Sequence, residues 1–141
     1  MSSICVAGSG PSGEGHSFAH VVTKKKLGWD YECIVLPRGN WDQPRTAGRA
    51  IIWQKYPHRK RWEKYYAGFS SGKMSNGMMA VFVAIDKYDP DEIVLIGFDN
   101  VLDSAKPTQH KWGAELLCMR SLVKITDSRQ GVSFSLRDKE Q

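Results

Sequence analysis

The sequence predicts an α/β fold, a three-layer α/β/α sandwich with a mainly parallel, Rossmann-like sheet. Two short apolar runs, residues 4–7 and residues 93–96, carry no charged side chain, and each runs directly into a glycine. Uninterrupted runs of this length are typical of parallel strands that are buried on both faces. Residues 77–87 are apolar almost all round, which is typical of a helix buried on a sheet. Strands and covering helices are therefore expected to alternate, as in this fold class.

The N-terminal half predicts three strands and one helix. Glycine and serine crowd the chain after the first strand, and Pro37 ends the second strand. A short helix that carries Phe18, Val21 and Val22 would connect these two strands. The predicted elements are a strand at residues 3–7, a helix within residues 12–27, a strand at residues 31–36 and a short strand at residues 51–53.

The C-terminal half predicts three helices and two strands. Ser75 or Asn76 can cap the buried helix, because short polar side chains accept hydrogen bonds from first-turn amides. We expect the first and fourth predicted strands to lie close together in the sheet. The predicted elements are a basic helix at residues 59–66, the buried helix at residues 77–87, the strand at residues 93–96, an amphipathic helix at residues 111–123 and an edge strand at residues 132–136.

The composition is typical of one soluble domain that spans residues 1–141. Hydrophobic residues make up 41% and charged residues 25% of the chain, and the net charge is +5. The chain has no apolar stretch of about 18 residues and no signal-peptide pattern. Cys5, Cys33 and Cys118 lack the spacing of metal ligands, and we expect Cys5 and Cys118 to be reduced thiols of the core. These features predict a cytoplasmic protein without a membrane span or a metal site.

Small and polar residues follow both apolar runs. In open parallel sheets, ligands bind just outside the carboxyl ends of the strands. The backbone amides of Gly10 and Ser12, with the hydroxyls of Ser9 and Ser12, would hold a phosphate or a ribose. Gly77 would let a helix N-terminus approach the ligand closely. A tight turn without function uses the same residue types. The candidate ligand-binding residues are Gly8, Ser9, Gly10, Ser12, Ser75, Asn76, Gly77, Gly97 and Phe98.

Three motifs occur in order along the chain: Gly-Ser-Gly-Pro-Ser at residues 8–12, Ser-Asn-Gly at residues 75–77 and Gly-Phe-Asp at residues 97–99. His110 follows them, just before a predicted helix. This arrangement resembles that of bacterial sialyltransferases of glycosyltransferase family 42. The resemblance implies transfer of a sugar from a CMP-linked donor to an acceptor hydroxyl, without a metal or other cofactor. It also implies that His110 is the catalytic base and that Asp99 binds sugar or ribose hydroxyls at the catalytic site.

Two other classes of function remain open. A non-catalytic binder of a nucleotide or nucleotide sugar would use the same pocket, and Val101 favours it because the family has a tyrosine there. A nucleic-acid-associated protein is the other class, since cations attract phosphates and aromatic rings stack on bases. A glycosyltransferase that acts on modified DNA would combine the two activities. The residues concerned are Arg59, Lys60, Arg61 and Lys64 for charge, and Trp62, Tyr65 and Tyr66 for stacking.

Overall fold

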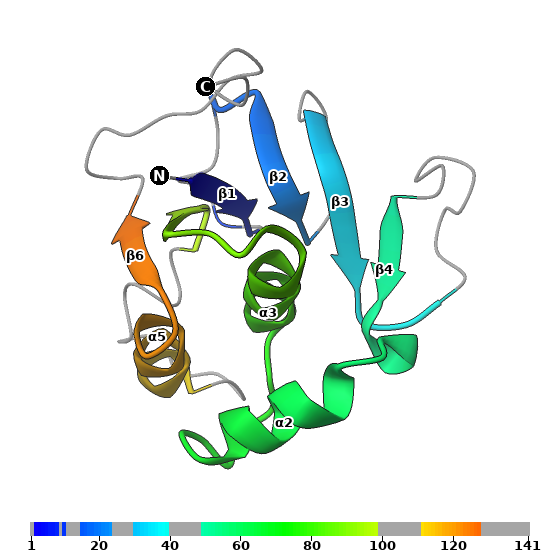
Figure 1. Cartoon of the computed structure of the whole chain (residues 1–141), viewed down its shortest axis with the longest axis vertical. Coiled ribbons are helices and arrows are strands. Elements are labelled where there is room, and N and C mark those ends of the chain that lie inside the picture. The colour runs from blue at the N-terminus through cyan, green and yellow to red at the C-terminus, as the bar shows by residue number, and fades with distance from the viewer. Residues whose placement is uncertain are drawn as a thin grey trace.

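The computed structural model describes residues 2–8, 10, 15–23, 30–39, 49–98 and 111–127. Within these residues the chain forms a parallel sheet and helices that cover it (Figure 1). The strands are β1 (Ser3–Ala7), β2 (Phe18–Val22), β3 (Asp30–Leu36), β4 (Ala50–Ile52), β5 (Glu92–Ile96) and β6 (Lys124–Asp127). The helices are the 3-10 helix η2 (Trp53–Lys55) and the α-helices α2 (Arg59–Ala67), α3 (Asn76–Tyr88) and α5 (Trp112–Arg120).

The sheet has six strands in the order β4-β3-β2-β1-β5-β6, and every neighbouring pair is parallel. This confirms the predicted α/β fold class with a Rossmann-like sheet. The first and fourth predicted strands are neighbours, with Ile4 opposite Ile93. From β1 the chain adds β2, β3 and β4 in turn on one side. It then crosses back and adds β5 on the other side of β1. The strand order therefore reverses between β1 and β5, which makes their carboxyl ends the topological switch point of the sheet.

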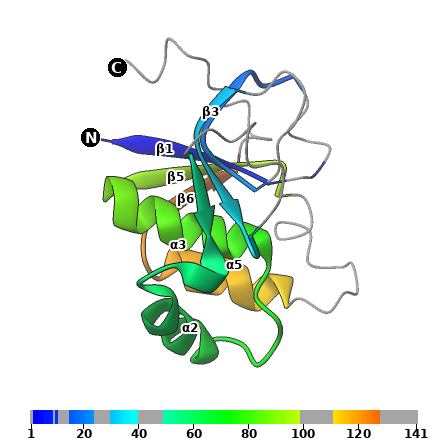
Figure 2. The same cartoon turned by 90° about the vertical axis from the view of Figure 1, so that its right-hand side faces the viewer.

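The three described α-helices lie on one face of the sheet (Figure 2). Helix α3 packs across β1, β2 and β3, α5 packs against both α3 and β6, and α2 packs on α3 farther from the sheet. Phe82 is at the centre of this layer, where its ring stacks on those of Trp53 and Trp62 at centroid distances of 6.2 and 4.5 Å. The other face of the sheet is also apolar and buried, with Cys5, Ala7, Ala19, Val22, Tyr31, Ile34, Leu36 and Ile96 in one cluster.

The helix predicted within residues 12–27 is wrong where the structure describes it, because Phe18–Val22 form strand β2. All five residues of β2 are buried, since the strand lies inside the sheet between β1 and β3. A short apolar run that is buried on both faces has no period of two, so its pattern does not distinguish a strand from a helix. The spacing of Phe18, Val21 and Val22 matched a helical face only by coincidence.

Strand β6 had no counterpart among the predicted elements. It has only four residues and contributes a single aliphatic side chain, that of Ile125, which lies opposite Ile93 of β5. The edge strand predicted at residues 132–136 lies outside the described residues. The remaining predicted strands and helices are confirmed with shifts of a few residues at their ends, and Trp53 belongs to η2 rather than to β4. In the described part of the chain, no helix is long and apolar enough to cross a membrane.

Candidate functional site

The turns after β1 and β5 are joined by backbone hydrogen bonds at the switch point. The Gly8 amide donates to the carbonyl oxygen of Ile96 at 2.7 Å, and the Gly10 amide donates to that of Gly97 at 2.8 Å. These bonds extend the pairing of β1 and β5 beyond the ends of both strands. The structure therefore brings together the first and third of the sequence motifs, as the sequence analysis predicted.

Glycine is required at both crossing points because the two backbones nearly touch. A Cβ atom on Gly8 would lie 2.8 Å from the carbonyl oxygen of Gly97. Gly97 has a φ of +71°, a left-handed conformation that side chains disfavour, and its Cβ would lie 3.0 Å from the oxygen of Gly10. The close approach of the two backbones thus explains the glycines of the first and third motifs without any ligand.

The Gly10 amide has a different role from the one expected. The sequence predicts that this group contacts a phosphate, but in the structure its hydrogen is directed at the Gly97 carbonyl oxygen. Ser9 and Ser12, the neighbours that were assigned to the same ligand, lie outside the described residues. Asp99 and His110 also lie outside them.

The N-terminus of α3 contributes the second motif. Ser75 is its N-cap, and the Oγ atom accepts a hydrogen bond from the Met78 amide at 3.2 Å. Asn76 and Gly77 are the first two helical residues, and their amides have no acceptor within the helix. The Asn76 side chain is exposed. This end of the helix carries the positive pole of its dipole, which favours an anionic or strongly polar group.

The ring of Phe98, a residue of the third motif, lies next to glycines of the first and second motifs. The ring is buried, and it lies against Gly77, where a Cβ atom would be only 2.5 Å from Cε2 of the ring. The same ring would be 3.1 Å from a Cβ atom on Gly8. Glycine at position 77 is thus explained by the packing of Phe98, rather than by the close approach of a ligand that the sequence predicts. Phe98 itself is packed inside the protein.

Glu115 is the polar residue of this region that sequence reasoning missed. It is completely buried on α5, yet its carboxylate accepts hydrogen bonds from the Ser75 amide at 2.9 Å, the Ser75 hydroxyl at 2.5 Å and the Tyr66 hydroxyl at 3.2 Å. Burial and then the Glu115 charge raise the pKa of Tyr66 to about 12, so this hydroxyl stays protonated and donates. The sequence signal that could have identified Glu115 is its helical spacing, because Glu115, Cys118 and Met119 lie on the same buried face of α5.

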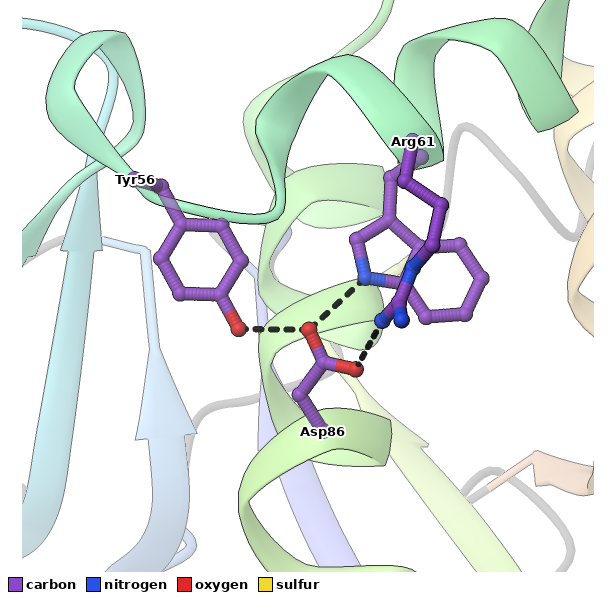
Figure 3. A network of polar contacts seen from close by, with 4 residues as sticks. Tyr56, Arg61 and Asp86 are labelled. Carbon is purple, nitrogen blue, oxygen red and sulfur yellow. Dashed lines mark hydrogen bonds and ion pairs between the residues drawn. The ribbon is translucent and has the colours of Figure 1, made fainter.

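The basic helix α2 is held to α3 by a network around Asp86 (Figure 3). The Asp86 carboxylate accepts hydrogen bonds from the Tyr56 hydroxyl at 2.6 Å and the Trp62 indole at 2.8 Å, and it pairs with Arg61 at 2.8 Å. The Arg61 guanidinium also lies over the Trp62 ring, 4.9 Å from its centroid. Arg61 is therefore committed to a partner within the protein, although its side chain is largely exposed.

The other candidate residues for nucleic-acid binding divide into two groups. Arg59 pairs with Glu63 at 3.8 Å and donates to the Gln54 carbonyl, while the rings of Trp62 and Tyr66 are buried and cannot stack on a base. In contrast, Lys60 and Lys64 are exposed and form no ion pair with any described residue, and Tyr65 is 37% exposed. The accessible part of this predicted surface is smaller than the sequence suggested.

The cysteines have the environment of core residues. All three are buried free thiols, and burial raises the pKa of both Cys33 and Cys118 to about 11. Such thiols are protonated at neutral pH and do not act as nucleophiles. Among the residues that the structure describes, no cluster of three or more His, Cys, Asp or Glu side chains could hold a metal ion.

Comparison of this chain with protein-family models, with curated proteins and with solved structures found no match. The sequence motifs and the geometry of the switch point are therefore the basis for a functional proposal.

Replacing Gly8 by alanine is expected to lower the free energy of unfolding by about 1–3 kcal/mol, the usual range for overpacking. The added methyl group would press on a backbone oxygen that is held in place by the Gly10 amide. Gly113 is the matched control, since it is helical and a methyl group added there would have open space around it. Alanine at this position should stabilise the protein by about 0.5–1 kcal/mol. Equal urea-unfolding midpoints for the two variants would contradict the geometry.

Proposed function

We propose that this protein binds a nucleotide-activated sugar at the carboxyl edge between β1 and β5, and that it acts as a sialyltransferase-like glycosyltransferase. The observation that carries the binding step is the switch point itself, where the Gly8 and Gly97 turns meet beside the N-terminus of α3. Ligands of open parallel sheets bind at such a point. The resemblance to glycosyltransferase family 42 favours a CMP-linked donor.

The described residues support this ligand class through hydrogen-bond donors. The amides of Asn76 and Gly77 and the exposed side chain of Asn76 lie at the positive end of α3, where a phosphate or a sugar hydroxyl is stabilised. Ser9 and Asp99 are the sequence neighbours of Gly8 and Phe98. We assign Ser9, with Ser12, to the phosphate or ribose, and Asp99 to sugar or ribose hydroxyls.

The proposed reaction needs one base and no metal. The acceptor oxygen attacks the anomeric carbon of the donor sugar, and the bond from that carbon to the phosphate oxygen breaks. CMP leaves with the electron pair of the broken bond, and the acceptor proton passes to the imidazole of His110. This assignment of His110 is supported by the resemblance, in which a histidine follows the third motif before a helix.

A thermal-shift screen over CMP, UDP, GDP and their sugars tests the binding step. A ligand at about 100 times its Kd should stabilise the native protein by about 2.7 kcal/mol, and CMP compounds should give the largest rise in Tm. Asn76→Asp should leave the stability of the unliganded protein unchanged or slightly higher, because a carboxylate favours a helix N-terminus. It should nevertheless reduce the shift by repelling the phosphate. An equal shift in both proteins would place the ligand elsewhere.

A non-catalytic nucleotide-sugar binder is the second candidate. It is favoured by Val101, which replaces the tyrosine of the resembling family. It predicts the same thermal shift with no release of CMP and no transfer. A nucleic-acid-associated protein remains the third candidate, supported by the exposure of Lys60, Lys64 and Tyr65. Binding of single-stranded DNA with a strong salt dependence would favour it, including its combined form as a glycosyltransferase of modified DNA.

A further inference from the structure

Helices α2 and α5 share an exposed apolar face, which we call the α2–α5 face. It consists of Tyr65 of α2, Phe69 just after the end of α2, and Leu117 of α5, whose exposed fractions are 37%, 36% and 62%. The Tyr65 and Phe69 rings lie 5.5 Å apart. The Tyr65 hydroxyl is 2.7 Å from the hydroxyl of Ser121, which is one helical turn beyond Leu117. Tyr65 and Phe69 thus lie beside the end of α5, the same end that carries Leu117 one turn before Ser121.

Leu117 is the most exposed large hydrophobic residue of the described chain. The next two residues, Cys118 and Met119, are completely buried, so α5 directs one apolar side to the core and Leu117 away from it. Single exposed apolar residues are common, but a group that spans two helices is characteristic of interaction sites. Tyrosine and phenylalanine are also enriched in the centres of protein interfaces.

The exposed charged side chains of α2 and α5 that have no ionic partner among the described residues are positively charged. Lys60 and Lys64 are exposed one turn apart on α2, and Arg120 is exposed at the end of α5; none of the three forms an ion pair with a described residue. The two acidic residues of these helices do not offset them. Glu63 faces Arg59, and Glu115 is buried inside the protein. A second copy of this chain would bring like charges together, so the face complements an acidic partner.

We propose that the α2–α5 face docks a short acidic segment of another protein, with apolar side chains on Tyr65, Phe69 and Leu117 and carboxylates near Lys60, Lys64 and Arg120. This role lies beyond the proposed function and uses none of the switch-point residues. The aliphatic side chain of Leu117 favours a peptide over a nucleic acid, because it offers no ring for a base to stack on. The burial of Trp62 and Tyr66 favours the same partner.

A random peptide library selected on the immobilised full chain tests this proposal, with Leu117→Gln as the counter-selection target. Enriched peptides should carry net negative charge and should have Leu, Ile or Phe at helical spacing. One enriched peptide, labelled and measured by fluorescence anisotropy, should bind Leu117→Gln about tenfold more weakly than the wild type. Lys60→Glu with Lys64→Glu should also weaken binding, and most of the salt dependence should disappear.

Lys87→Glu is the matched control for the charge reversal, since Lys87 is an exposed lysine of α3 that is not part of the α2–α5 face, and this change should leave the Kd unchanged. Unchanged melting curves for all variants would show that they are folded. The proposal is overturned if no peptide is enriched, if enriched peptides are basic or uncharged, or if Leu117→Gln binds them as the wild type does. It is also overturned if a single-stranded oligonucleotide binds through the same residues more tightly than any peptide. None of these outcomes bears on nucleotide binding at the switch point.

Discussion

Replacing Glu115 by alanine is expected to lower the free energy of unfolding by about 3 kcal/mol or more. The change removes the acceptor of three hydrogen bonds, those from the amide and hydroxyl of Ser75 and from the hydroxyl of Tyr66. Each buried donor that is left unsatisfied costs about 1–3 kcal/mol, and water cannot reach a site that is completely buried without opening the structure. The Ser75 cap would also lose its support, so the N-terminus of α3 should loosen.

Urea unfolding followed by circular dichroism measures this loss. The free energy of unfolding of Glu115→Gln should lie between those of the wild type and the alanine variant. The glutamine amide keeps the shape of the side chain and one acceptor oxygen, but its NH₂ group would face a hydrogen-bond donor. Asp91→Ala is the control for removing an exposed carboxylate, since among the described residues the Asp91 carboxylate accepts a hydrogen bond only from the amide of exposed Ser2. A loss below about 1 kcal/mol for Glu115→Ala would show that the three bonds contribute no more than surface contacts do.

Replacing His110 by alanine is expected to reduce sugar transfer, or hydrolysis of the donor, by about 10²–10⁴-fold, the usual contribution of a general base. Nucleotide affinity should change by no more than a few-fold, because the base acts on the acceptor hydroxyl and not on the nucleotide. The measurement is release of CMP from a CMP-linked sugar, with affinity followed separately by calorimetry.

His58→Ala is the matched control for this experiment. His58 is exposed, precedes α2 and makes no side-chain capping bond, so its removal should leave turnover unchanged. Turnover of the His110 variant at the wild-type rate would remove His110 from the mechanism. Absence of turnover in the wild type, together with nucleotide binding, would favour the non-catalytic candidate.

The parts of the fold that could be predicted were those with an unambiguous local signal. Strands β1 and β5 each contain an unbroken apolar run that is followed directly by glycine, and the Ser75 cap begins a helix with almost no polar side chain. These signals also predicted that the Gly8 and Gly97 turns would be neighbours, because the carboxyl ends of parallel strands share one edge. Hydrophobic burial decides the strands and the buried face of the helix, and the Ser75 hydroxyl decides where the helix begins.

The features that could not be predicted depend on tertiary contacts. Strand β2 is defined by its neighbours on both sides, since its own residues fit a helix as well. Strand β6 is held by pairing with β5 and by the Thr126 hydroxyl, which donates to Glu92. The roles of the Gly10 amide and of Glu115 follow from partners that are distant in the sequence, Gly97 and Ser75. A pattern within a short stretch of sequence cannot identify partners that are so far apart along the chain.

The packing of Phe98 has a consequence for the evolution of this protein. Its ring occupies the space where side chains at positions 8 and 77 would otherwise lie. Positions 77 and 98 come from separate parts of the chain, yet a side chain at one can grow only if the other shrinks. A lineage that acquires a larger residue at position 77 must therefore shrink the residue at position 98, or lose the contact between the turn and the helix. Positions 77 and 98 are thus expected to co-vary, with an aromatic residue at 98 tolerated only beside glycine at 77, while position 8 stays glycine because of the Gly97 backbone oxygen.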